Sequence, residues 1–174
     1  MASVKTGIVM MNLGGPATLD QVEPFLLELA RADQANRVNY ARALRMCGTQ
    51  QSRPALASWT RDSRPDVRAA AFETLAHVGV DDVSAALALE ALDKDEERVR
   101  AMAAYALQGW TGDRAAATHL ARHLDDAWPV AIRAARSLKT MGAGGLSELQ
   151  ARASRPDLAG ILARQMLWSG AVEC

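Results

Sequence analysis

One short pattern recurs along the chain and restricts what it can fold into. Segments that start at Val67, Val99 and Val130 each place a leucine eight residues further on. Together with two further copies, the pattern has five anchors: Leu44, Leu75, Leu107, Leu138 and Met166. Consecutive anchors are 31, 32, 31 and 28 residues apart. A period of this length indicates a stack of similar units, each of which buries its apolar side against its neighbours.

Each copy has the spacing of a helix. The core-facing residues after Val67 follow the i, i+3, i+4, i+7 pattern of one helix face, namely Ala70, Ala71, Thr74, Leu75 and Val78. A glycine stands four or five residues beyond each anchor, where a helix often ends in a left-handed residue. These glycines are Gly48, Gly79, Gly112, Gly142 and Gly170. A second helical segment follows the first four, at 51–60, 81–92, 113–124 and 144–153. The predicted unit is therefore helix A, a tight turn, helix B and a short loop.

The segments "RPDVRAAAFETLAHVG" and "EERVRAMAAYALQGW" resemble HEAT repeats, in the short bacterial form named after phycobilisome lyases. The resemblance covers roughly Leu19 to Ser169, and the fourth unit departs from it with Ala131 in place of Arg68 and Arg100. It implies that helix A lies outside and helix B lines a concave side. We therefore expect an all-α fold, a right-handed α-solenoid of about four and a half HEAT-like helical hairpins, over residues 18–174.

The opening "KTGIVMMNLGGPATLDQVEPFLLEL" resembles the N-terminus of ferrochelatases, in which a strand, a turn and a helix begin a Rossmann-like fold. The match ends near Ala30. The metal-inserting His and Glu of that family and its other strands do not follow, so we expect no ferrochelatase activity. We expect residues 1–17 to be an N-terminal extension or a fusion segment. The helix after it should cap the stack, with a stripe of Leu19, Val22, Leu26 and Leu29.

Charge and composition restrict the partners. Twenty basic residues balance twenty acidic ones. The net charge alternates by block: +4 over residues 33–64, −6 over 65–96, zero over 97–127 and +4 over 128–155. This alternation does not match a continuous phosphate backbone, so we expect no nucleic-acid binding. The longest apolar stretch near the start is too short to span a bilayer. We expect a cytoplasmic protein without membrane insertion, or else the soluble part of a membrane-tethered protein.

His119 and His123 are four residues apart on one helix, a spacing that can direct two imidazoles toward one metal ion, with Asp125 or Asp126 as a further ligand. The glutamate of an H-E-x-x-H motif is absent, because Leu120 follows His119. We therefore interpret the two histidines as exposed polar residues and predict no metal and no cofactor. Cys47 shares the position of Val78 in its unit and is predicted to be a buried small apolar residue without catalytic chemistry.

These features favour a non-enzymatic scaffold that binds a protein partner on the concave helix-B face. The outward positions of the B helices supply the expected binding residues: Trp59, Glu90, His119, Arg122, His123, Glu148 and Arg152. Leu162 and Leu167 lie in a final helix A without a helix B after it, so a homodimer through that open end is also expected. The alternative is a lyase-like or chromophore-handling subunit, which the named repeat family allows.

Overall fold

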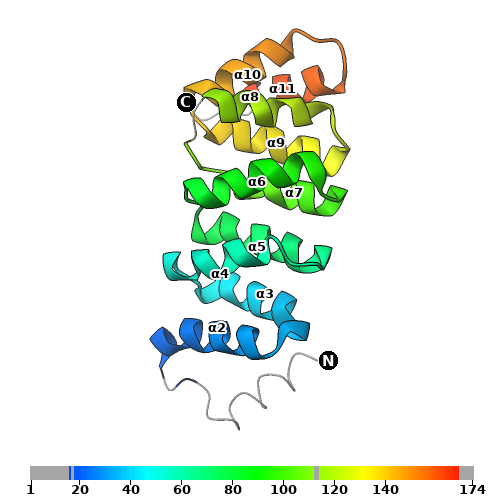
Figure 1. Cartoon of the computed structure of the whole chain (residues 1–174). Coiled ribbons are helices and arrows are strands. Elements are labelled where there is room, and N and C mark those ends of the chain that lie inside the picture. The colour runs from blue at the N-terminus through cyan, green and yellow to red at the C-terminus, as the bar shows by residue number, and fades with distance from the viewer. Residues whose placement is uncertain (1–15, 17, 112–113, 169–174) are drawn as a thin grey trace.

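The computed structural model describes residues 16, 18–111 and 114–168. Two layers of helices are stacked along one axis (Figure 1). The A helices are α3 (Arg37–Cys47), α5 (Pro65–Val78), α7 (Glu97–Ala106), α9 (Trp128–Thr140) and α11 (Leu158–Trp168). The B helices are α4 (Arg53–Trp59), α6 (Asp82–Lys94), α8 (Arg114–Arg122) and α10 (Ala143–Ala153). Helix α2 (Val22–Ala32) precedes them. The predicted all-α solenoid is confirmed.

Among the described residues, four single-turn 3₁₀ helices precede or follow these elements: η1 (Leu19–Gln21), η2 (Gln34–Asn36), η3 (Gln50–Ser52) and η4 (His123–Asp125). Within the part of the chain that the structure describes, no helix is both long enough and apolar enough to cross a bilayer. The predicted extension, residues 1–17, lies almost wholly outside the described residues.

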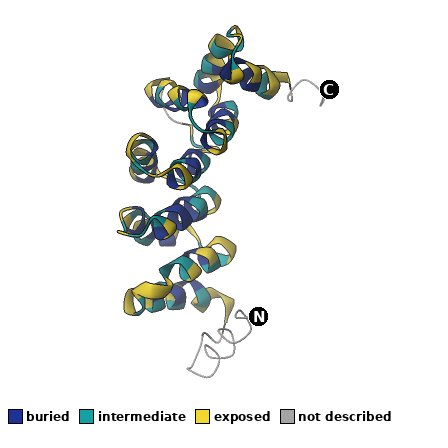
Figure 2. Ribbon diagram, turned by 90° about the vertical axis from the view of Figure 1, so that its right-hand side faces the viewer, coloured by how far each residue is buried: buried dark blue, intermediate teal, exposed yellow. Residues whose placement is uncertain are grey.

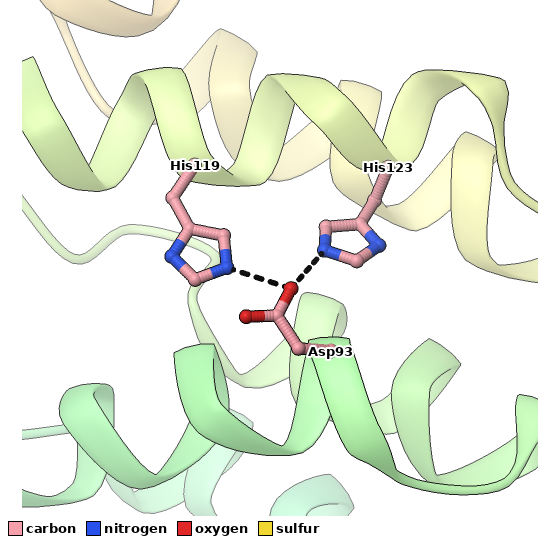
Figure 3. A group of neighbouring side chains, drawn as sticks. All are labelled: Asp93, His119 and His123. Atoms are coloured by element: carbon pink, nitrogen blue, oxygen red, sulfur yellow. Dashed lines mark hydrogen bonds and ion pairs between the residues drawn. The ribbon is translucent and has the colours of Figure 1, made fainter.

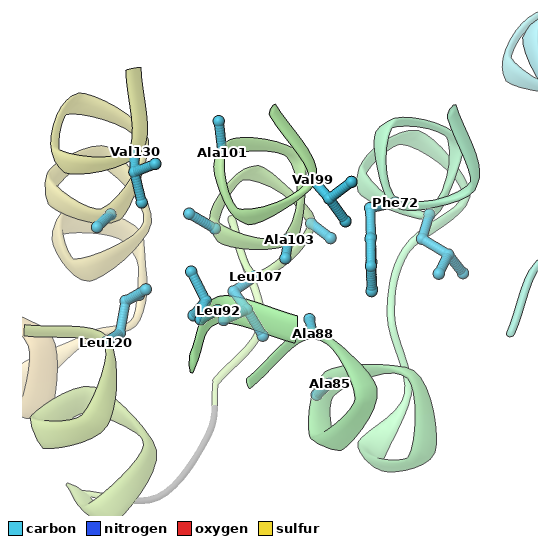
Figure 4. Close-up of a cluster of buried hydrophobic side chains, with 14 of the residues drawn as sticks. Phe72, Ala85, Ala88, Leu92, Val99, Ala101, Ala103, Leu107, Leu120 and Val130 are labelled. Carbon is cyan, nitrogen blue, oxygen red and sulfur yellow. The ribbon is translucent and has the colours of Figure 1, made fainter. Parts of the chain in front are cut away.

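Four of the five repeat anchors form the centre of the core, and Met166, the fifth, is partly buried. Leu44, Leu75, Leu107 and Leu138 are all fully buried, as the periodicity predicted. Alanines fill most of the remaining buried A-helix positions, and small side chains let neighbouring A helices pack closely. Buried residues therefore face the contacts between helices, while exposed residues cover the outer sides (Figure 2). Figure 4 shows leucines and alanines of successive units meeting in the middle of the stack.

Two buried hydroxyls join consecutive A helices. Thr74 Oγ1 in α5 donates to the carbonyl of Ala41 in α3, at 2.8 Å. Ser137 Oγ in α9 donates to the carbonyl of Ala104 in α7, at 2.7 Å. Each hydroxyl stands directly before a leucine anchor, so this interaction recurs at the same place in the repeat. A buried hydroxyl needs such a partner to offset its lost contact with water.

Three arginine–aspartate ion pairs also follow the repeat, and we call them the Arg–Asp ladder. In each pair an A-helix arginine reaches the aspartate that precedes the next A helix. The pairs are Arg37–Asp62, Arg68–Asp95 and Arg100–Asp126. The arginines are 31 and 32 residues apart, so the ladder has the period of the fold. Ala131 occupies the same place in α9 and ends the ladder.

The prediction that helix A ends in a left-handed glycine is correct in two units. Gly79 and Gly142 have φ values of 87° and 77°, which favour glycine. It is wrong at Gly48, where φ is −69° and the chain leaves α3 extended. Gly112 and Gly170 lie outside the described residues. In the third unit α7 ends early, at Ala106, and the positive φ belongs to Gly109.

Helix α2 packs on α3 as the predicted cap, with Leu26 and Ala30 buried. The predicted stripe is wrong at Leu19, which is 91% exposed because η1 precedes the regular helix. Glu23 is buried instead. Its Oε1 accepts hydrogen bonds from the backbone N–H of Thr49, at 3.0 Å, and from the hydroxyl of Ser52. The cap is thus attached to the first unit by a buried carboxylate as well as by apolar contact.

Candidate protein-binding face

The outer sides of α4, α6, α8 and α10 form one surface, which we call the B-helix face. The first three of these helices stand further apart from one another than the A helices do. Open grooves lie between them. One, of about 280 Å³, lies between α6 and the turn that follows α4, beside Glu90 and Arg61. A second, of about 530 Å³, lies between α6 and α8. The concavity predicted for this face stays a prediction.

The second groove combines apolar and charged walls. Leu89 and Trp110 supply apolar surface, and Asp82 and His119 supply polar groups. Trp110 Nε1 donates to Asp82 Oδ1 at a long distance of 3.4 Å, which holds the indole at the groove wall. A groove lined by both apolar and polar residues has the mixed composition of protein–protein contact surfaces.

Trp59 does not belong to this face, which corrects the prediction. Its side chain lies in the core, and only 5% of the residue is exposed. The reason is helical geometry: Leu56 and Trp59 are three residues apart in the short helix α4, so both point to the same side. Since Leu56 is fully buried, Trp59 follows it inward.

Glu90 and Arg122 are exposed, as expected for outward positions. Glu90 pairs with Lys94 along α6, with an Oε1–Nζ distance of 3.1 Å. An exposed ion pair of this kind contributes little to stability. Both residues are therefore available to a partner at little cost to the fold.

Glu148 and Arg152 of α10 lie on the face but are bound to the preceding unit. Thr118 Oγ1 of α8 donates to Glu148 Oε1 at 2.7 Å. Arg152 Nη1 donates to Asp125 Oδ2 of η4 at 2.5 Å. These two predicted binding residues thus also connect consecutive B helices.

His119 and His123 meet an aspartate that sequence reasoning missed. Nε2 of His119 lies 3.0 Å from Oδ1 of Asp93, and Nε2 of His123 lies 3.3 Å from the same oxygen (Figure 3). Partial burial acts to raise the pKa of Asp93, but hydrogen bonds from the two histidines outweigh it and lower that pKa. The expected third group was Asp125 or Asp126. Asp125 instead binds Arg152, and Asp126 lies at the other nitrogen of His123.

The repeat spacing relates Asp93 to an equivalent residue in the next unit. Asp93 precedes Asp125 by 32 residues, one repeat length, so the two occupy equivalent positions, in the last turn of α6 and at the end of η4, which follows α8. Asp125 reaches Arg155 in the next unit at 3.1 Å, as Asp93 reaches His123 in its own next unit. The anchors Leu75 and Leu107 are also 32 residues apart, so the repeat alignment pairs Asp93 with Asp125, but only the stacking of α6 against α8 shows that Asp93 meets the histidines.

The comparisons with known proteins agree with this architecture. A family model described as HEAT repeats matches residues 22–108, which is half of the chain. A stretch of 26 residues is 65% identical to a mitochondrial ferrochelatase of Dictyostelium discoideum, over 15% of this chain and 6% of that enzyme. The chain thus spans only a small part of the length of this relative. By the family match and the stacked helical hairpins, the chain belongs to the HEAT-repeat family.

Proposed function

We propose that the chain is a non-enzymatic scaffold of the cytoplasm, in which residues 18–174 bind a protein partner on the B-helix face. The observation that carries the proposal is the pair of grooves on the two sides of α6, toward the turn after α4 and toward α8, which open on a face of mixed charge. HEAT-repeat stacks use extended surfaces of this kind to bind other proteins. The ferrochelatase match supports no transfer of that enzyme's activity, because it covers 6% of the enzyme.

The residues that line the groove between α6 and α8 indicate which kind of partner segment would bind there. Leu89 and Trp110 offer an apolar contact, and the exposed carboxylate of Asp82 stands beside them. The block 65–96 carries a net charge of −6. A partner segment with an apolar anchor next to a basic residue fits both properties, because aromatic anchors and complementary charges set affinity and specificity.

Blocking that groove tests the proposal. Ala86 lines it and is exposed, so Ala86→Arg fills the groove and adds positive charge without disturbing the core. We expect the variant to capture the partner at least ten-fold less well than the unchanged protein. Ala32→Arg is the matched control, because Ala32 is an exposed alanine at the end of α2 and lies away from the groove.

Site-specific photo-crosslinking identifies the contact face independently of affinity. A crosslinker at Arg122 should label the partner, and one at Arg136, an exposed residue of α9, should not. Equal capture by Ala86→Arg and Ala32→Arg, together with crosslinks from Arg136 alone, would overturn the assignment of the B-helix face.

A further inference from the structure

Asp93 near the end of α6 and the two histidines of α8 and η4 form a cluster across the junction of two units. The candidate ligand atoms, one from each residue, all lie within 4.8 Å of one another. We propose that Asp93, His119 and His123 bind a Zn²⁺ ion, which joins the second and third repeats. The site lies on the B-helix face, but the proposal stands whether or not a protein partner binds there.

The separations fit a zinc site. Tetrahedral Zn²⁺ with bonds of about 2.0–2.1 Å places its ligand atoms roughly 3.3 Å apart. The two distances from Asp93 Oδ1, 3.0 Å and 3.3 Å, are close to that value. The wider separations need small side-chain adjustments, which are open to Asp93 and His119 because their side chains are 48% and 26% exposed.

The donor atoms select the metal. Two imidazole nitrogens and one carboxylate oxygen form a set typical of zinc sites that keep a further position for water or another ligand. Mg²⁺ and Ca²⁺ prefer oxygen ligands throughout, so the two nitrogens disfavour them. The half-exposed carboxylate of Asp93 leaves a path from solvent to the site.

A second carboxylate orients His123. Nδ1 of His123 lies 3.3 Å from Oδ2 of Asp126. Asp126 is itself fixed by Arg100, whose Nε and Nη2 donate to it at 2.9 Å and 2.6 Å. A histidine that binds a metal through one nitrogen usually donates the other N–H to such a carboxylate. The pair of carboxylates around His123 therefore has the arrangement of a metal ligand and its supporting group.

The hydrogen-bond partners of His123 do not match a neutral imidazole. Both of its ring nitrogens face carboxylate oxygens, which accept hydrogen bonds but do not donate them. A neutral imidazole carries only one N–H, so Nε2 and Asp93 Oδ1 would then present lone pairs to each other. Either a second proton or a cation between the two atoms removes this repulsion. A Zn²⁺ ion would accept the Nε2 lone pairs of both His119 and His123, because both Nε2 atoms point to the same oxygen of Asp93.

Local helix preference does not account for Asp93. The residue lies in the last turn of α6, where the helix dipole disfavours a negative charge. Replacing Asp93 by asparagine should therefore leave the helix intact or slightly more stable. This makes Asp93→Asn a variant that removes a metal ligand while it preserves the fold.

The test is zinc titration of the tag-free protein by calorimetry, with far-UV circular dichroism to verify folding. We expect one Zn²⁺ per chain in the unchanged protein and at least a ten-fold weaker affinity in Asp93→Asn and in His119→Gln. The control is His77→Gln, a change in an exposed histidine of α5 that lies outside the cluster, which should leave the affinity unchanged. Zn²⁺ should also raise the melting temperature of the unchanged protein, because an ion that binds only the folded state stabilises it.

Co²⁺ as a spectroscopic probe separates this site from the cysteines. We expect visible bands of four-coordinate Co²⁺ with nitrogen and oxygen ligands, without thiolate charge transfer, and their loss in Asp93→Asn. Absence of zinc binding would show that the cluster is only a set of hydrogen bonds and ion pairs, like that of Asp125 and Arg155. Equal binding by the unchanged protein and both ligand variants would place the ion elsewhere. Either result would overturn the proposal.

Discussion

Arg68 in α5 binds both carboxylate oxygens of Asp95, the residue that follows α6. Nε lies 2.7 Å from Oδ2 and Nη2 lies 2.6 Å from Oδ1. The side chains are only 18% and 13% exposed. This two-point contact fixes the loop that leads from α6 into α7, so it sets the position of one A helix against the next.

Removing the Arg68 guanidinium should therefore destabilise the fold. We expect Arg68→Ala to lower the free energy of unfolding by about 2–3 kcal/mol, between the values of exposed and fully buried ion pairs. The neighbouring change Arg98→Ala, at an exposed position of α7, should cost less than about 0.5 kcal/mol. Urea denaturation measures both. Similar losses in the two variants would show that the ladder contributes nothing specific.

The buried carboxylate of Glu23 should make stability depend on acidity. Burial acts to raise the pKa of Glu23, but hydrogen bonds from Ser52 and Thr49 outweigh it and lower that pKa below its ordinary 4.5. The stabilisation from Glu23 is then fully present above about pH 4.5 and is lost as the pH falls through the lower value of the folded state.

The variant Glu23→Gln isolates this contribution. At pH 7 it should be less stable than the unchanged protein by about 1–2 kcal/mol, since a charged acceptor of several hydrogen bonds is removed. The difference should shrink as the pH falls from 5 toward 3. Glu28→Gln, an exposed change on the same helix, should be as stable as the unchanged protein at pH 7. A constant difference for Glu23→Gln across this range would contradict the assignment.

Two glycines close together should respond to alanine with opposite signs. Gly142 has φ 77° and ψ −151°, a conformation that is almost restricted to glycine, so Gly142→Ala should cost about 1–3 kcal/mol. Gly144 is helical, and an added Cβ would meet only ordinary contacts, the nearest at 3.7 Å from Ala117. Gly144→Ala should stabilise by about 0.5–1 kcal/mol. Thermal unfolding distinguishes the two outcomes, and equal signs would contradict the turn conformation.

The burial of Trp59 is also testable. Trp59→Ala should destabilise the protein by about 3–5 kcal/mol, as large-to-small changes of aromatic residues in a core do. Trp128, at the start of α9, is 57% exposed, and Trp128→Ala should cost much less. Guanidinium denaturation compares them. If both changes had the same small effect, Trp59 would be a surface residue, as the sequence had suggested.

The helices and their anchors were predictable because the same pattern occurs five times. Leu75 and Leu107 each occupy the most buried place in their unit, and the repetition makes a chance pattern improbable. The ends of the helices were less predictable. Helix α7 stops at Ala106, before its anchor, because the turn with positive φ is at Gly109.

The site was less predictable because it depends on which residues of neighbouring units meet. His119 and His123 were recognised as a pair from their spacing along one helix. Asp93 lies 26 residues before His119, and only the stacking of α6 against α8 brings them together. The burial of Trp59 depends on local geometry. Trp59 lies one helical turn after the buried Leu56 in α4, so its side chain points to the same side, and the repeat pattern does not contain this information.

The alanine at position 131 affects how the stack of repeats unfolds. Because alanine occupies the ladder position in α9, that position cannot supply the arginine of a contact like Arg68–Asp95 at the junction to α11. In an array whose units are coupled only to their neighbours, the weakest junction sets where cooperative melting divides. Helix α11, the last helix of the described chain, should therefore open and reclose by itself, exchanging its amide protons early while the first four units stay closed.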